Sequence, residues 1–298
     1  MTQIVEPQQL SDEEQRAVRA MLTAALVGDG VEALGEAPVA LLGSSRPTVS
    51  HLLAVQGGSP VGYASVLPGR DGEPATVEAV VAPAERRRGI GAELIARALE
   101  SGGPGATVWA HGDLPAARAV ATRLGLHARR ELLQLRRGLG SGNPLPPLTE
   151  RADIALRTYA GAADDAEILR VNNAAFDWHP EQGGWSAGQL AEQTAAAWFD
   201  PAGLFLAWEP RAAGAEQLLG FHWTKIHGPG LGEVYIVGVD PSAHGRGLGR
   251  HLTLAGLHYL ADRVPVVSLY VEGDNTAALR MYENLGFERF RADVAYGG

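Results

Sequence analysis

A glycine-rich turn in the second half of the chain has the composition of a phosphate-binding loop. Gly245, Gly247 and Gly249 follow a predicted strand, 233–239, and lead into a predicted helix, 247–261. Glycine adopts positive φ easily and lets a ligand approach the backbone closely. The first amides of a helix have no internal partners and lie at the positive end of the helix dipole. The turn is therefore expected to hold phosphate oxygens.

The spacing of these glycines excludes two common nucleotide-binding folds. A dinucleotide fold needs G-x-G-x-x-G after its first strand, whereas here Arg250 follows Gly249 and the segment lies late in its domain. A P-loop needs Gly-Lys-Ser/Thr, which is absent from the segment. Neither fold is expected.

The same turn occurs twice. Val81-Ala82-Pro83 followed by Gly89-Ile90-Gly91 recurs 158 residues later as Val239-Asp240-Pro241 followed by Gly247-Leu248-Gly249. Three prolines and three glycines within 138–148 interrupt helix and strand between the two copies. We therefore expect two homologous domains, 1–137 and 151–298, joined by a linker at 138–150.

Hydrophobic periodicity gives both halves one pattern: antiparallel strands, a strand–helix–strand crossover, then a helix and a strand. The first half gives helices at 12–27, 89–99 and 116–124, and strands at 52–55, 61–67, 76–81, 106–110 and 131–136. The second half gives helices at 164–175, 247–261 and 275–284, and strands at 154–159, 203–208, 218–226, 233–239, 266–271 and 287–296. The expected fold class is α/β (α+β), with a mixed, mostly antiparallel sheet flanked by helices in each domain.

The turns resemble the acetyl-CoA signature of the GNAT superfamily of N-acetyltransferases, R/Q-x-x-G-x-G/A after a strand that ends in V-x-P. Arg86 to Gly91 matches it fully, and the second copy departs from it only in having His244 at the first position. The resemblance implies two tandem GNAT domains, an N-acetyltransferase activity and acetyl-CoA as co-substrate.

The second half also resembles the family element N-x-x-A-x-x-x-Y-x-x-x-G-F, which implies that Asn275 contacts the pantetheine arm and that Tyr282 lies near the thioester sulfur. In the first half, Leu114 and Ala121 stand at the corresponding positions, and Glu233 corresponds to Ala75. We therefore expect one catalytic half and one degenerate half that lacks proton-transfer groups.

Acetyl transfer to an amine requires a base for the attacking nitrogen and an acid for the leaving thiolate. Glu233 begins the strand that leads to the turn and is the expected base. Tyr282 is the expected acid: its phenol, with a reference pKa of about 10 against about 8.5 for a thiol, is protonated at neutral pH and can donate its proton to the sulfur as it leaves. Without a catalytic role, Glu233 would be an exposed acid at a strand end, and Tyr282 would be a half-buried aromatic residue of a helix.

Four stretches, 170–176, 179–185, 197–201 and 220–225, resemble a tandem-domain branch of this superfamily, the mycothiol synthases. The resemblance implies acetyl transfer to the cysteinyl amine of Cys-GlcN-Ins, a thiol-sugar amine. It implies substrate contacts at Glu36, Glu181, Lys225, Glu233 and Tyr270, although structural roles remain open for Glu36, Glu181 and Lys225. It implies acetyl-CoA contacts in the first half at Ala79, Val80, Val81, Arg87, Arg88, Gly89, Ile90, Gly91 and Ala92. In the second half it implies them at Val237, Gly238, Val239, His244, Gly245, Arg246, Gly247, Leu248, Gly249, Arg250, Asn275, Thr276, Ala277, Ala278, Leu279 and Arg280.

Two other motifs have structural explanations. Gly184-Trp185-Ser186-Ala187-Gly188 matches the hydrolase pattern G-x-S-x-G but lacks the preceding strand, and Ser186 with Gln189 is typical of a helix capping box. The histidines of the second half, His222, His227, His244, His251 and His258, carry no H-E-x-x-H or carboxylate clamp and are expected to be solvated or core residues, so no metal is expected.

Composition narrows the function further. The 298 residues contain no cysteine and carry a net charge of −9, which excludes a cysteine nucleophile and does not favour nucleic acid. No apolar run is long enough to span a membrane. We expect a monomeric cytoplasmic enzyme. The alternatives are a tandem GNAT that acetylates another small amine, such as an aminosugar or a peptide N-terminus, and a non-catalytic acetyl-CoA sensor.

Overall fold

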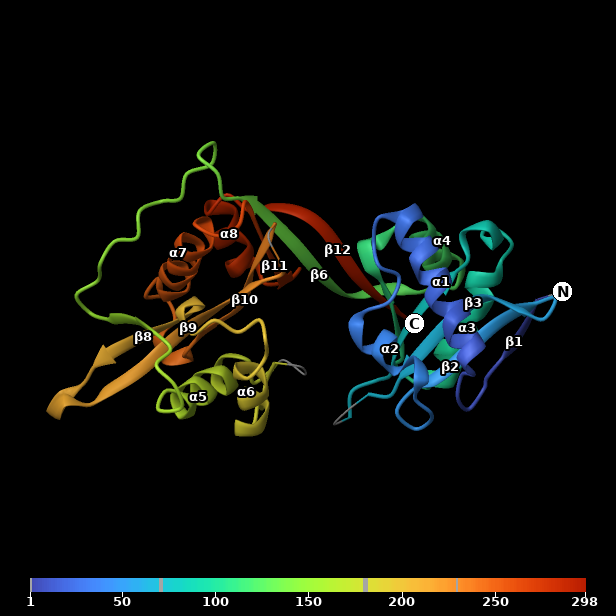
Figure 1. Ribbon diagram of the computed structural model, residues 1–298, viewed down its shortest axis with the longest axis horizontal. Helices are drawn as coiled ribbons and strands as arrows, with labels where there is room; N and C mark the ends of the chain where they lie inside the picture. The colour runs from blue at the N-terminus through green and yellow to red at the C-terminus, as the bar shows by residue number, and fades with distance from the viewer. Residues whose placement is uncertain (1, 70–71, 179–181, 229) are drawn as a thin grey trace. The chain divides into compact units, whose positions relative to one another are not determined.

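The computed structural model describes residues 2–69, 72–178, 182–228 and 230–298 (Figure 1). The chain divides into two compact units. Unit 1 comprises Met1–Leu133, Glu272–Asp274 and Arg291–Gly298, and unit 2 comprises Gln134–Val271 and Asn275–Phe290.

Unit 1 is a sheet with strand order β1-β2-β3-β4-β5-β12. Its strands are β1 (Gln3–Val5), β2 (Ser50–Gln56), β3 (Ser59–Leu67), β4 (Thr76–Val81), β5 (Thr107–Ala110) and the last part of β12 (Glu288–Gly297). Its helices are α1 (Asp12–Asp29), α2 (Glu36–Ala40), α3 (Ile90–Gly102) and α4 (Pro115–Arg123). The pair β4–β5 is parallel, and β1–β2, β2–β3, β3–β4 and β5–β12 are antiparallel.

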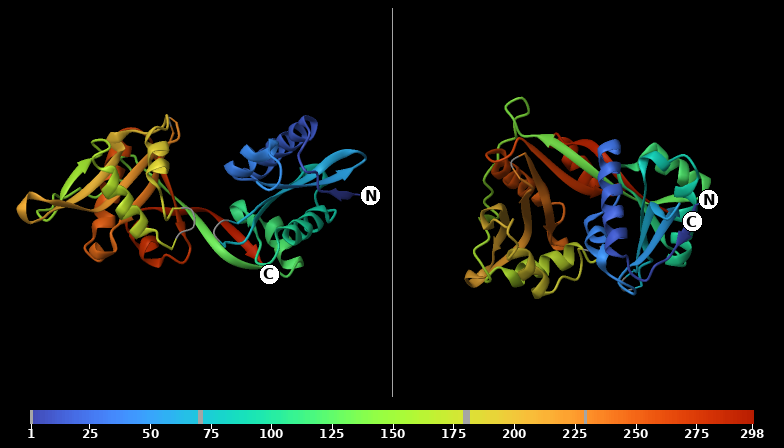
Figure 2. Two further views of the ribbon diagram at one scale, coloured as in Figure 1. Left: turned by 90° about the horizontal axis from the view of Figure 1, so that it is seen from below. Right: turned by 45° about the vertical axis from the view of Figure 1, so that its right-hand side comes forward.

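Alternation along the strands places helices on both faces of this sheet (Figure 2). On β2, Leu52 packs in the cluster that includes Leu94 of α3, whereas the next residue, Leu53, packs in the cluster that includes Val18 of α1. Successive side chains of a strand point to opposite faces, so one strand contributes to both cores. Helix α1 begins at a capping box in which Ser11 and Glu14 satisfy each other's backbone amides.

Unit 2 is a sheet with strand order β6-β11-β10-β9-β8-β7. Its strands are the second part of β6 (His127–Gly138), β7 (Ala155–Thr158), β8 (Leu204–Pro210), β9 (Glu216–Ile226), β10 (Leu231–Val239) and β11 (Val266–Glu272). Its helices are α5 (Asp165–Ala175), α6 (Ala187–Thr194), α7 (Leu248–Ala261) and α8 (Thr276–Asn284). The pair β10–β11 is parallel, and β7–β8, β8–β9 and β9–β10 are antiparallel.

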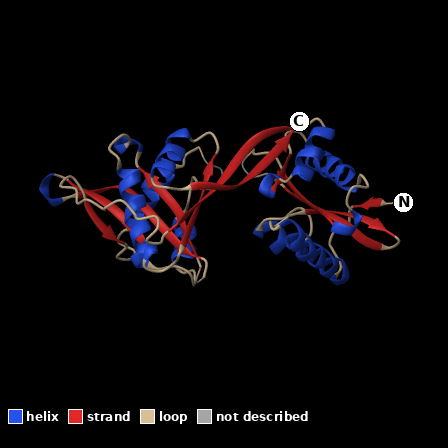
Figure 3. Ribbon diagram, turned by 90° about the horizontal axis from the view of Figure 1, so that it is seen from above, coloured by secondary structure: helices blue, strands red, loops and turns tan. Residues whose placement is uncertain are grey.

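Helices again cover both faces in unit 2 (Figures 1 and 3). Ile168 and Val171 of α5 pack against Trp223 of β9, while Leu248 and Leu252 of α7 pack against the other face of the sheet. The predicted mixed, mostly antiparallel sheet with flanking helices is confirmed in both units. The predicted strands and helices recur with ends shifted by a few residues, and the short elements β1, α2 and α6 were not among them.

The two units exchange their last strands along the chain. β6 begins in unit 1 and ends in unit 2 beside β11, whereas β12 begins in unit 2 and ends in unit 1 beside β5. Val294, Ala295 and Tyr296 pair with β5, so the C-terminal end of the chain completes the N-terminal unit. The compact units therefore do not follow the predicted bounds 1–137 and 151–298, because strand pairing is decided by tertiary contact rather than by order along the chain. Among the described residues, no helix has the length and apolarity needed to cross a membrane.

We predict that deleting residues 291–298 opens unit 1 selectively. Val108 on β5 is buried, and β5 loses its neighbouring strand when β12 is shortened. Hydrogen–deuterium exchange is expected to speed up in β4 and β5 while β8 and β9 stay protected. Deletion of Gly298 alone, which is exposed, is the control. Unchanged protection of 107–110 in the truncated chain would show that β12 is not an integral strand of unit 1.

Candidate active site

The site in unit 2 begins where two parallel strands separate. β10 and β11 pair only through Leu231–Glu233 and Val266–Ser268. Beyond Glu233, β10 is bonded to β9 on one side and carries a bulge between Val234 and Ile236. The other edge of Val237–Val239 is thus left without a strand partner, and free backbone groups of this kind can bind an amide-containing chain as an added strand would.

The phosphate turn follows the open edge directly. Gly245 and Gly247 have φ values of 78° and 74°, and Gly247 is the N-cap of the 14-residue helix α7. The first amides of α7 therefore have no hydrogen-bond partner within the helix. Unit 1 repeats the arrangement: β4 and β5 pair only through Thr76–Val77 and Thr107–Val108, and Gly89, with φ of 85°, is the N-cap of α3. Both turns have the geometry of an anion-binding helix N-terminus.

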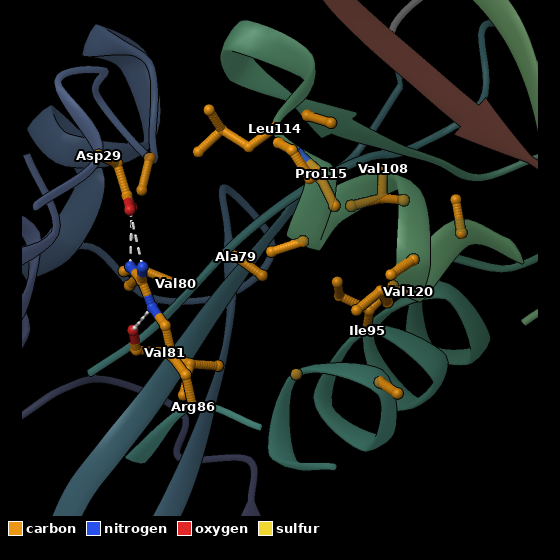
Figure 4. Close-up of a pocket in the computed structure, with 18 of the residues that line it drawn as sticks. Asp29, Ala79, Val80, Val81, Arg86, Ile95, Val108, Leu114, Pro115 and Val120 are labelled. Atoms are coloured by element: carbon orange, nitrogen blue, oxygen red, sulfur yellow. Dashed lines mark hydrogen bonds and ion pairs between the residues drawn. The ribbon is translucent and has the colours of Figure 1, made fainter. Parts of the chain in front are cut away.

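The first residue of the signature supports the turn in both units. Arg86 Nε donates to Val81 O (3.1 Å), and its two terminal nitrogens lie 2.7 and 2.8 Å from the carboxylate oxygens of Asp29 (Figure 4). His244 Nε2 lies 3.2 Å from the equivalent carbonyl, Val239 O. One ring N–H is enough for this bond, which explains why histidine replaces arginine here.

Unit 1 contains a cavity of about 850 Å³ between β4, β5, α3 and α4 (Figure 4). A smaller cavity of about 420 Å³ lies beside it, between the start of α3 and the end of α4, and is lined by Arg88 and Arg123. Ala121, which stands where unit 2 has Tyr282, lines the larger cavity. The residues predicted to contact acetyl-CoA in the first half all line one of the two: Ala79, Val80, Val81, Arg87, Arg88, Gly89, Ile90, Gly91 and Ala92.

In unit 2 the predicted acetyl-CoA residues lie in three segments: the end of β10, the turn with the start of α7, and the start of α8. Val237, Gly238 and Val239 end β10; His244, Gly245, Arg246, Gly247, Leu248, Gly249 and Arg250 form the turn and the start of α7; Asn275, Thr276, Ala277, Ala278, Leu279 and Arg280 begin α8. The Arg246 guanidinium is held by Asp153 (3.0 Å) and Glu209 (2.8 Å), which leaves its backbone as the part available to a phosphate. Asn275 Oδ1 accepts from the amide of Ala278 (3.1 Å), so Asn275 also caps α8.

The two predicted catalytic side chains are both buried. Glu233 is 8 % exposed, and one of its carboxylate oxygens lies 2.5 Å from His227 Nε2. Tyr282 is 7 % exposed and packs edge-on against Phe287. Burial raises the pKa of the Tyr282 hydroxyl to about 12. Tyr282 therefore keeps its proton throughout the neutral range.

The predicted substrate residues are only partly brought together. Lys225 is the cross-strand partner of Glu233, and its ammonium lies over the rings of Trp198 (4.7 Å) and Tyr235 (5.2 Å). Tyr270 is half-exposed on β11, two residues beyond the register partner of Glu233. Glu36 is exposed at the first residue of α2 in unit 1, and Glu181 lies outside the described residues.

The counterpart of Glu233 in the first half is Thr76, not Ala75. Glu233 pairs with Lys225 on β9, and at the same place in unit 1 Thr76 pairs with Leu67 on β3. The bulge in β10 adds one residue that β4 lacks, so a constant sequence offset fails on its far side. Thr76, like Ala75, carries no carboxylate.

Sequence reasoning also missed titratable groups in unit 1. His111 lines the larger cavity and lies 3.2 Å from Glu78 and 3.3 Å from Asp293. Titratable groups therefore lie at the unit 1 cavity, but not at the positions that correspond to Glu233, Asn275 and Tyr282. No local signal reveals the cluster, because Asp293 is 182 residues away from His111.

The explanations offered for the remaining motifs hold in part. Ser186 is the N-cap of α6 and forms a capping box with Gln189, as predicted. His222 is a core residue whose burial lowers its pKa to about 4. His227 is different, because it contacts the predicted base. No group of three or more potential metal ligands occurs among the residues that the structure describes.

Comparison with known proteins agrees with this geometry. The sequence profile of the acetyltransferase (GNAT) family matches residues 20–126 and 171–287. The chain is 59 % identical to a mycothiol acetyltransferase of Gordonia bronchialis, over 97 % of this chain and 93 % of that one. It is 55 % identical to the mycothiol acetyltransferase of Nocardia farcinica, over 97 % and 95 %.

A solved structure, a tandem GNAT protein from the clavulanic acid biosynthesis pathway, has the same fold with a TM-score of 0.67. It is 22 % identical and covers 99 % of this chain and 98 % of that one. The predicted pair of GNAT domains, the acetyltransferase class and acetyl-CoA as co-substrate are confirmed by these matches. With two copies of the fold, each with its open strand edge and its phosphate turn, the chain belongs to the acetyltransferase (GNAT) family.

Proposed function

We propose that this chain transfers the acetyl group of acetyl-CoA to the cysteinyl amine of Cys-GlcN-Ins, giving mycothiol and CoA, and that the reaction takes place in unit 2. Relatives at 55 and 59 % identity over nearly the whole chain are named mycothiol acetyltransferase. The observation that carries the assignment to unit 2 is that buried Glu233 and buried Tyr282 both stand in unit 2, whereas unit 1 has Thr76 and Ala121 at the corresponding positions.

Glu233 is the base of the proposed reaction. An amine attacks a carbonyl carbon only in its neutral form, so one proton must leave the nitrogen. Glu233 accepts that proton, directly or through water. His227 Nε2 lies 2.5 Å from Glu233 Oε2. Because the His227 side chain is 38 % exposed, it connects the buried carboxylate to solvent. Free amide groups of the open β10 edge supply donors for the oxyanion that forms on the carbonyl.

Tyr282 is the acid. As the new C–N bond forms, the C–S bond breaks and the sulfur leaves with an electron pair. Tyr282 supplies the proton for that sulfur from a buried hydroxyl that is protonated at neutral pH. The amine's proton and the tyrosine's proton thus move at different atoms, and no acetyl-enzyme is required.

Polar groups around Glu233 suit an acceptor rich in hydroxyls. Lys225 donates from a position fixed by two aromatic faces. Tyr270 presents a half-exposed phenol on the neighbouring strand. We propose that Lys225 and Tyr270 bind the sugar and inositol hydroxyls. The substrate contacts of Glu36 and Glu181 stay predictions. Monomeric state and cytoplasmic location stay predictions.

Unit 1 is proposed to bind acetyl-CoA without transferring its acetyl group. Its two cavities, the phosphate turn and the open edge of β4 fit a pantetheine arm and its phosphates. Leu114 and Ala121 stand where unit 2 has Asn275 and Tyr282, so the acid is absent at that position.

The direct test is an assay with purified protein, acetyl-CoA and Cys-GlcN-Ins. Release of CoA with formation of the N-acetyl product, identified by mass, is the expected result. Initial rates should show intersecting lines, because both substrates must be bound together. Turnover of aminosugars or peptide amines in place of Cys-GlcN-Ins would transfer the assignment to another acceptor, and binding of acetyl-CoA without any turnover would indicate a sensor.

Replacing Glu233 by glutamine should lower turnover by about 10²-fold near neutral pH. The loss should shrink at high pH, where the acceptor amine is already neutral and needs no base. A pH–rate profile of E233Q beside the wild type measures both effects. Glu192→Gln, an exposed acid on α6, is the matched control. A wild-type rate for E233Q at pH 7 would remove Glu233 from the role of base.

Replacing Tyr282 by phenylalanine should lower turnover by about 10²-fold at every pH, because the thiolate must leave under all conditions. Tyr259→Phe is the matched control, since its hydroxyl donates to Asp200 (2.5 Å). If the loss in Y282F disappeared at low pH, the protonation of sulfur would not depend on Tyr282.

The two phosphate turns provide a matched pair of variants. Gly247 and Gly89 both have positive φ, and in each case the nearest atom to an added Cβ is an arginine nitrogen at 3.9 Å. Gly247→Asp should abolish turnover, because its carboxylate enters the cradle of the pyrophosphate. Gly89→Asp, with equal strain, should keep much of the activity. The opposite result in well-folded proteins would place catalysis in unit 1.

A further inference from the structure

A cluster of three ionisable side chains lies where the cleft of unit 1 begins. β4 and β5 last pair at Val77 and Val108, and Glu78 is the next residue on β4. His111, just past the end of β5, lines the 850 Å³ cavity. Asp293 comes from the other end of the chain, on the exchanged part of β12. All three side chains are mostly buried, with exposed fractions of 19 % for His111, 11 % for Glu78 and 21 % for Asp293.

The two carboxylates hold opposite edges of the imidazole ring. His111 Nε2 lies 3.2 Å from Glu78 Oε2, and Nδ1 lies 3.3 Å from Asp293 Oδ2. The Nδ1 contact is a hydrogen bond, whereas the Nε2 contact is an ion-pair distance without hydrogen-bond geometry. Only an imidazolium places positive charge beside both carboxylates. Burial on its own would lower the pKa of His111, but the bonds and charges of Asp293 and Glu78 outweigh it and raise that pKa to about 10. The ring is thus an imidazolium at neutral pH.

Each carboxylate is also held by a backbone amide that does not depend on the imidazole. Gly35 N donates to Glu78 Oε2 (2.5 Å), and Gly112 N donates to Asp293 Oδ1 (2.7 Å). The two acids are therefore fixed in place on either side of the ring. Two fixed, buried carboxylates with a gap between them form a recognition site for a nitrogen cation, since each isolated charge is costly to bury and one cation offsets both.

We propose that Glu78 and Asp293 form a binding site for a small nitrogen cation beside the cavity of unit 1, and that His111 of the same chain, which lines that cavity, fills it. The ligand class is a planar or primary nitrogen cation of imidazolium size or smaller. Among the described residues of unit 2, Glu233 at the strand junction pairs with the more exposed His227 instead.

The consequence for catalysis rests on the proposed function. An acceptor amine arrives as an ammonium, and the carboxylates that would attract it in unit 1 are already paired with His111. This internal cation gives a second reason, besides the missing tyrosine, why unit 1 holds acetyl-CoA without acetylating an amine. The binding site itself does not depend on that activity.

The test removes the internal cation and offers an external one. In His111→Ala, the full-length protein should lose about 5 °C or more in Tm, because two carboxylates are left buried without a partner. Added imidazole or methylammonium should restore most of that loss in a saturable way and leave the Tm of the wild type unchanged. No acetyl-CoA is present, so failure of the proposed acetyl transfer does not affect the readout.

Two controls keep the result interpretable. In the triple variant His111→Ala/Glu78→Gln/Asp293→Asn, imidazole should no longer raise Tm, because the acids that bind it are neutral amides. If His111→Ala does not fold, the protonation of His111 in the wild type decides the matter by NMR, with His111→Gln used to assign the ring signals. The charged groups acting on the ring are Glu78 and Asp293, and Arg291 acts on Asp293 in turn. A neutral His111 at pH 7, or imidazole shifts that are equal in wild type and H111A, would overturn the proposal.

Discussion

The separation of one pair of parallel strands is the constraint on which both halves of this protein depend. β10 and β11 pair over three residues and β4 and β5 over two, and then each pair diverges. A strand edge left open inside a folded domain would be unfavourable unless something bonded to its free amides and carbonyls. Each open edge leads directly into a turn whose helix begins with free amides of its own. The separation of the strands therefore places the free amides and carbonyls of the open strand edge next to the free amides of the helix N-terminus.

The two units differ in a few residues beside the open strand edge. The bulge in β10 adds one residue beside Glu233, and β4 pairs with β3 without such a shift. Tyr282 on α8 is buried, whereas Ala121, at the corresponding position on α4, lines the large cavity of unit 1. Unit 1 thus keeps the glycine turn and the helix N-terminus, while its side chains differ at the positions of Glu233 and Tyr282.

Because of the strand exchange, residues from the C-terminal end of the chain form part of unit 1. Unit 1 takes its sixth strand from the C-terminal end of the chain, and with it Asp293, which holds His111 and accepts from Gly112. Tyr296 on the same strand lines the cavity and donates to Asp113 (2.7 Å). The N-terminal cleft is therefore built partly from the last residues of the sequence, so neither half of the chain is a complete domain by its own sequence range.

The sequence by itself determined what depends on short spacing. The glycine turns and the Ser186 cap are set by residues within a turn or two of one another, where backbone geometry is nearly independent of the rest of the fold. The repeat is found by comparing two such local patterns 158 residues apart. Only the tertiary structure decided the counterpart of Glu233, because a single bulged residue shifts strand register without changing the local pattern. Likewise, the partners of His227 and His111 follow from which strands become neighbours. The contact between His111 and Asp293 joins residues 182 positions apart, and such a pairing is fixed by the order of strands in the sheet, which no local periodicity records.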